Sequence, residues 1–91
     1  MAGEAVAFTE VVDSRKGSIR ARGHLTVQGA DLLSGAVLAL HDRGHRRVLL
    51  DLQGLHGYDA AGLLMLQHLQ VSMAADGGTL IVMHAPAYSG R

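Results

Sequence analysis

The chain has 91 residues, with eight basic side chains, eight acidic side chains and no cysteine. This length suits one domain, spanning residues 1–91, and the lack of cysteine excludes disulfides and thiolate metal sites. The balanced charge argues against direct nucleic-acid binding, which draws its affinity from a basic excess. No apolar run approaches the ~20 residues of a membrane helix, and the chain does not open like a secretory signal. We therefore expect a cytoplasmic protein without membrane insertion.

The first third of the sequence predicts a β-hairpin. Residues 4–12 indicate a strand, and the polar stretch 13–17, which ends in Gly17, suits the turn. Residues 18–25 alternate with a period of two, so one face of this strand is expected to be buried and the other wet. The residues expected on the buried face are Ile19, Ala21, Gly23 and Leu25.

The pattern then changes to helical spacing and back. Residues 30–42 predict a helix with an apolar stripe formed by Leu32, Leu33, Ala36, Val37 and Leu40, and Gly44 is placed for a left-handed C-terminal cap. Residues 47–52 contain Val48, Leu49 and Leu50, a continuous apolar run typical of a central strand, and a loop is predicted at 53–58. Asp59 precedes a second predicted helix at 60–75, which residues 76–78 end. The last strand is predicted at 79–83, and Pro86 stops it.

These elements predict the order β-β-α-β-α-β. Two strand–helix–strand units imply parallel pairing through right-handed crossovers, while the first strand joins antiparallel through its hairpin. The expected fold class is α/β, a single domain in which helices pack on a mixed, mostly parallel sheet.

Several short motifs occur along this pattern in a recognisable order. Asp51-Leu52 ends a strand, Asp59-Ala60-Ala61-Gly62-Leu63 opens a helix, Gly23-His24-Leu25-Thr26 lies upstream and Gly77-Gly78-Thr79-Leu80 lies downstream. From about residue 19 to residue 86, the chain resembles the STAS domain family, of the anti-sigma factor antagonist (anti-anti-sigma factor) type. The resemblance implies a STAS fold and a non-catalytic role in protein binding and transcription regulation.

The resemblance also implies a switch that this sequence lacks. In regulated members, the first serine after the helix-capping aspartate is phosphorylated by an anti-sigma factor with a histidine-kinase-like ATPase fold. Here that position is Ala60, and Ala61 has no hydroxyl either. Three interpretations stay open: an antagonist held in its binding-competent form, a branch without the switch such as transporter-associated STAS subunits, or a Ser→Ala substitution.

The helix at 60–75 carries two apolar stripes on a wheel of ~100° per residue. One stripe is predicted to face the core and is formed by Leu63, Met65, Leu66, Leu69 and Met73 with Gly62. The other comprises Ala60, Leu64, Val71 and Ala75. It either packs on the neighbouring helix or serves as a docking stripe. Asp59 likewise has two interpretations, as a helix cap or as part of a partner site. Asp51 is expected to bind nearby loop amides.

We therefore expect the chain to bind an anti-sigma factor kinase and so to release a sigma factor. The alternative is a structural STAS subunit of a larger complex, either associated with an ABC transporter or a homo-oligomeric scaffold. The expected partner-binding residues are Gly57, Tyr58, Asp59, Ala60, Ala61, Leu64, Gln67, His68 and Val71. STAS domains usually continue with another helix after the proline. This shorter C-terminus is expected to leave apolar area uncovered, which makes a homodimer a further hypothesis.

The sequence predicts neither an enzyme nor a cofactor or metal. His41 and His45 have the i, i+4 spacing of helical metal ligands, but Gly44 lies between them and no third ligand is close in sequence. The stretch 54–57, Gly-Leu-His-Gly, is too short for a phosphate-binding loop, and no nucleophilic triad is recognisable.

Overall fold

The computed structural model describes residues 8–85. The elements follow the predicted order. They are β1 (Thr9–Asp13), β2 (Ser18–Leu25), α1 (Val27–Asp42), β3 (Arg47–Tyr58), α2 (Ala60–Ala75) and β4 (Thr79–Met83).

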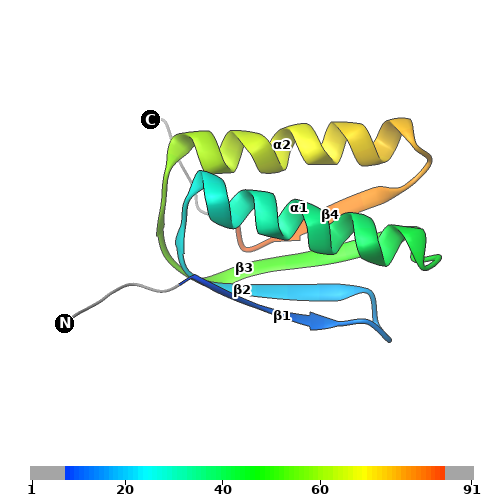
Figure 1. The fold of residues 1–91 in the computed structure, drawn as a ribbon, viewed down its shortest axis with the longest axis horizontal. Coiled ribbons are helices and arrows are strands. Elements are labelled where there is room, and N and C mark those ends of the chain that lie inside the picture. The colour runs from blue at the N-terminus through cyan, green and yellow to red at the C-terminus, as the bar shows by residue number, and fades with distance from the viewer. Residues whose placement is uncertain (1–7, 86–91) are drawn as a thin grey trace.

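The four strands form one sheet in the order β1-β2-β3-β4. The β1–β2 pair is antiparallel, whereas β2–β3 and β3–β4 are parallel. Figure 1 shows both helices on the same side of this sheet. Two successive crossovers of one hand, each moving to the next strand, place their helices on one face. The fold is therefore a mixed α/β sheet with one face covered by helices and the other face open among the described residues.

The core lies between the helices and the covered face of the sheet, and its buried side chains are aliphatic or methionine. On β2, Ile19, Ala21 and Leu25 are each no more than 1% exposed, while Arg20 and Arg22 point to the open face and are exposed. The buried residues of the other elements are Ala30, Leu33, Val37, Leu40, Val48, Leu50, Leu52, Leu63, Leu66, Leu69, Met73 and Leu80.

In the N-terminal half of the chain, two element boundaries differ from those predicted from the sequence. The first strand ends at Asp13 instead of residue 12, and residues 4–7 of its predicted span lie outside the described residues. Helix α1 begins at Val27, three residues before the predicted start. The reason is a cap: the Thr26 hydroxyl accepts a hydrogen bond from the backbone N–H of Gly29 at 3.0 Å. Apolar spacing alone predicts a later start, because the capping Thr26 is polar and lies outside the apolar pattern.

The predicted loop at 53–58 is wrong, because β3 continues through it to Tyr58. This part of β3 pairs with the second half of β2, with register shifts on either side of residues 22–23. A Cβ at Gly54 would lie 2.9 Å from the Ala21 carbonyl oxygen, and one at Gly57 would lie 3.0 Å from the His24 ring. These glycines therefore permit a close approach of irregular strands, although in the sequence they resemble loop signals. Gly44, in contrast, has the expected positive φ, 107°.

Candidate docking surface

Helix α2 exposes the second apolar stripe that its sequence predicted. Its core face is buried through Gly62, Leu63, Leu66, Leu69 and Met73. On the opposite side Leu64 is 51% exposed and Val71 is 69% exposed. Ala60 and Ala75 are exposed as well. The stripe does not pack on α1, so the interpretation as a helix-packing face is wrong.

Charge is absent from this helix altogether. Residues 60–75 contain no Lys, Arg, Asp or Glu. A surface helix normally places charged or polar residues opposite its core face, and a helix that is apolar around most of its circumference is normally covered. Gln67, His68 and Ser72 are the exposed polar residues of α2, and the apolar flank with Leu64 and Val71 beside them has the composition of a contact surface.

The start of α2 is tied to the end of β2. The backbone N–H of Asp59 donates to the Leu25 carbonyl oxygen at 2.7 Å. The Asp59 carboxylate meets His24 Nε2 at 3.0 Å, and both side chains are about half exposed, 53% and 43%. These two contacts hold the first turn of α2 against the strand that precedes α1.

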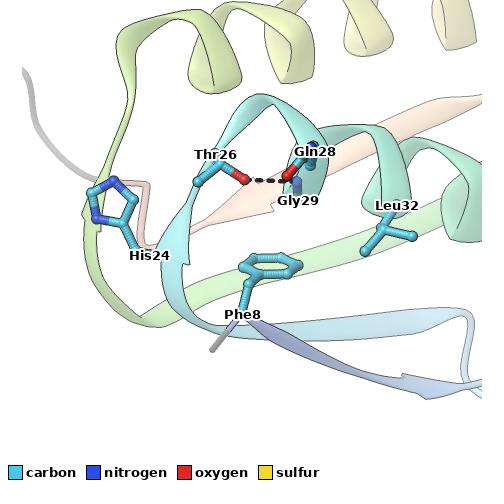
Figure 2. Close-up of a pocket in the computed structure, with 6 residues that line it drawn as sticks. All are labelled: Phe8, His24, Thr26, Gln28, Gly29 and Leu32. Carbon is cyan, nitrogen blue, oxygen red and sulfur yellow. Dashed lines mark hydrogen bonds between the residues drawn. The ribbon is translucent and has the colours of Figure 1, made fainter. Parts of the chain in front are cut away.

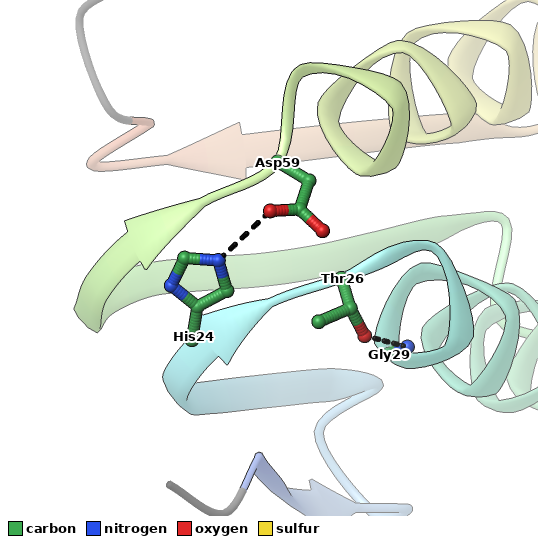
Figure 3. Close-up of polar contacts among 4 residues, drawn as sticks. All are labelled: His24, Thr26, Gly29 and Asp59. Carbon is green, nitrogen blue, oxygen red and sulfur yellow. Dashed lines mark hydrogen bonds and ion pairs between the residues drawn. The ribbon is translucent and has the colours of Figure 1, made fainter.

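Asp59 occupies the N-cap position of α2 but its side chain caps nothing. No side-chain hydrogen bond reaches the first-turn amides from this residue. Figure 3 shows the carboxylate directed at the His24 ring, while Thr26 caps α1 through Gly29. The side-chain capping interpretation of Asp59 is therefore wrong, because the carboxylate is engaged by the imidazole of His24 on the neighbouring strand.

Ala60 is the first residue of α2 and is exposed. It borders a shallow hollow of about 300 Å³. The residues that line this hollow are Tyr58, Ala60, Leu63, Leu64 and Gln67. Most of the other expected partner-binding residues, Asp59, Ala61, His68 and Val71, are exposed on or next to α2, whereas Gly57 and Tyr58 are partly buried at the end of β3.

The sequence reasoning missed a second apolar region at the start of α1. A hollow of about 490 Å³ is lined by Phe8, His24, Thr26, Gln28, Gly29 and Leu32, which are drawn in Figure 2. A neighbouring hollow of about 410 Å³ joins Val27 and Leu32 to Met65 of α2. Leu32 is 58% exposed. The sequence carried a signal for it: Leu32 widens the apolar stripe of α1 beyond the arc that a core-facing helix needs.

Asp51 has the structural role that the sequence predicted. Its Oδ1 accepts a hydrogen bond from the backbone N–H of Gln53 at 2.9 Å and meets His84 Nδ1 at 2.9 Å. The Gln53 amide, followed by the His84 side chain, lowers the pKa of this carboxyl below its ordinary value. Asp51 thus fastens the open face of β3 to the residue that follows β4.

The histidines do not assemble a metal site. Within residues 8–85 no three potential ligands converge. His41 Nδ1 meets the His45 carbonyl oxygen at 3.3 Å, while His45 Nε2 lies 2.7 Å from the Ser14 carbonyl oxygen. In the same part of the chain, neither helix has the length and hydropathy needed to cross a membrane.

Residues 8–89 match the model of a family described as "Mlab, STAS domain". No curated protein matches the chain. Among solved structures, the unphosphorylated form of the anti-sigma factor antagonist SpoIIAA aligns with a TM-score of 0.63 and 15% identity, covering 89% of this chain and 76% of that one.

Two further solved structures share the fold. A STAS domain of an anti-sigma factor antagonist from Rhodobacter sphaeroides aligns with a TM-score of 0.54 and 15% identity, covering 86% of this chain and 85% of that one. A protein called Mglu aligns with a TM-score of 0.62 and 21% identity; the alignment covers 86% of this chain but only 20% of Mglu. At these identities the likeness concerns the fold alone.

Proposed function

Because this chain belongs to the STAS domain family, we propose that it is a cytoplasmic, non-catalytic docking module that binds an anti-sigma factor. The anti-sigma factor would be of the histidine-kinase-like ATPase type, and its capture would release a sigma factor for transcription. Binding would use the first turn of α2 and the exposed flank with Leu64 and Val71. The observation that carries this proposal is the exposed apolar flank of α2, formed by Ala60, Leu64, Val71 and Ala75.

The chemistry at Ala60 makes this docking constitutive. A phosphoryl group carries about −1.5 to −2 charge at neutral pH and, placed at an apolar contact, opposes binding by repulsion and desolvation. A methyl group at this position accepts no phosphate. In the proposed function, release from the partner therefore depends on competition and concentration.

A second candidate is a structural STAS subunit of a larger complex, such as a transporter-associated assembly. The observation in its favour is the pair Ala60 and Ala61: without a hydroxyl at either position, the module cannot be switched off by a kinase at the position that regulated family members use. Both functions use a protein partner and no cofactor.

The two candidates are separated by affinity capture from the source cytosol followed by mass spectrometry. The baits are the chain itself, Ala60→Asp and Leu64→Asp. Leu38→Asp is the matched control, because Leu38 is a comparably exposed leucine, 44% exposed, in the last third of α1. All four proteins must give the same circular dichroism spectrum before the captured proteins are compared.

Under the proposed function, the chain and Leu38→Asp capture an ATPase-type anti-sigma factor, and the Ala60 and Leu64 variants lose it. Capture of transporter subunits with the same dependence on Leu64 would support the structural-subunit candidate. If Ala60→Asp and Leu64→Asp capture the same partner as the unsubstituted chain, the proposed docking surface is excluded. Loss of the folded spectrum in Leu64→Asp alone would contradict the placement of Leu64 on the surface.

A further inference from the structure

The two edge strands of the sheet are protected very differently. On β1, Glu10 points to the helix-covered face, opposite Ala21, where its Oε1 is buried without a hydrogen-bond partner within the described residues. Burial raises the pKa of this carboxyl. An inward-pointing charge on an edge strand opposes pairing with another chain, because such pairing would bury the charge further. The β1 edge is therefore guarded.

The β4 edge has no comparable guard. Its sequence, Thr-Leu-Ile-Val-Met, has no charge and no proline and consists of residues that favour strands. Within residues 8–85, no strand pairs with its outer side. Ile81, Val82 and Met83 are all partly exposed. An uncharged apolar edge of this kind is a template for another strand.

The backbone direction at this edge follows from two hydrogen bonds. The Thr79 N–H donates to the Arg46 carbonyl oxygen at 2.8 Å, toward β3. Because backbone groups alternate in direction along a strand, those of Leu80 and Val82 point to the outer edge. Consistent with this, Gln70 of α2 reaches down to donate to the Leu80 carbonyl oxygen at 3.1 Å.

We propose that β4 pairs antiparallel with β4 of a second copy of this chain, around a two-fold axis at Ile81. In this register Leu80 lies opposite Val82 of the second copy, and Ile81 lies opposite Ile81 of the second copy. The outward N–H and C=O groups of Leu80 and Val82 then satisfy one another across the axis. The Gln70 contact is compatible with this pairing, because a carbonyl oxygen accepts two hydrogen bonds.

The side chains around this axis suit self-association. A two-fold contact brings each residue near its own copy, so a charge close to the axis would meet a like charge. Neither β4 nor α2, which packs above it, carries Lys, Arg, Asp or Glu. On the open face, Ile81 lies beside Leu49 of β3. Pairing would therefore create a continuous apolar row across both copies.

The test is sedimentation velocity over a concentration series with Ile81→Lys, Ile81→Glu and their equimolar mixture. The wild-type chain is expected to dimerise, and each variant to dimerise at least about tenfold more weakly, since like charges then lie directly opposite. The mixture should recover the dimer, because Lys and Glu then face each other. Val11→Lys is the matched control: Val11 is 61% exposed on the same face of the guarded edge β1.

Hydrogen exchange of the unsubstituted chain provides a second test. Hydrogen exchange of the Leu80 and Val82 amides should slow as the wild-type concentration rises. Three outcomes would each overturn the proposal. The wild-type chain could stay monomeric at every concentration, or the Leu80 and Val82 amides could be protected equally at all concentrations. The third outcome is a mixture of the two variants that does not recover the dimer.

Discussion

Gly62 of α2 lies directly against the backbone of Thr26, the residue that caps α1. A Cβ at position 62 would lie 2.8 Å from the Thr26 carbonyl oxygen and 3.0 Å from its carbonyl carbon. Contacts with backbone cannot be relieved by rotating a side chain. The first turn of α2, which carries Ala60, can therefore lie this close to Thr26 only because Gly62 has no side chain.

Gly62→Ala is expected to destabilise the fold by about 1–3 kcal/mol, the usual cost of overpacking, despite the better helix propensity of alanine. Gly35→Ala is the matched control, because a Cβ at Gly35, also within a helix, meets nothing within 4 Å. That control is expected to stabilise by about 0.5–1 kcal/mol. Urea unfolding measures both. Equal effects of the two substitutions would contradict the close contact.

Thr26→Ala is expected to cost about 1 kcal/mol, because it removes the side-chain cap of α1. Asp59→Asn is expected to cost about 0.5 kcal/mol or less, because it removes only an exposed pairing with His24. The free energies of unfolding at neutral pH give this ranking. A larger loss for Asp59→Asn would mean that the carboxylate stabilises α2 in a way its contact with His24 does not explain.

Glu10→Gln is expected to stabilise the protein at neutral pH. Burial raises the folded pKa of Glu10 above its ordinary value of 4.5. The stability that the protonated carboxyl contributes is therefore fully present below that value. It is lost as the pH rises through the folded pKa. The advantage of the glutamine variant should therefore shrink to nothing as the pH falls below the ordinary value. Thermal unfolding from acid to neutral pH checks this, and an advantage that persisted in acid would refute it.

Asp51→Asn is expected to show the opposite dependence. The folded pKa of Asp51 lies below its ordinary value of 3.8, so the ionised carboxylate stabilises the fold above the ordinary value. This contribution is lost as the pH falls through the folded pKa. The variant should be less stable than wild type at neutral pH, with the difference closing in acid. Asp31→Asn, at an exposed carboxylate of α1, controls for the general loss of a charge.

The local sequence was sufficient for most of the fold. Period-two alternation from Ser18 to Leu25 identified the buried face of β2, and helical spacing identified the core face of α2. The family's motifs placed Ala60 at the first position of that helix. These predictions succeeded because burial against a single core imposes its period directly on the order of side chains.

What the tertiary structure decided depends on neighbours distant in sequence. Residues 54 and 57 became part of a strand because β2 lies beside them, and their glycines allow its close approach. The Asp59 carboxylate faces His24, 35 residues earlier, instead of its own helix. Likewise, only the packing of α1 beside α2 showed that Leu64 and Val71 remain exposed. A hydrophobic pattern reports that a side chain favours burial, but only the assembled fold shows whether this chain supplies the surface that buries it.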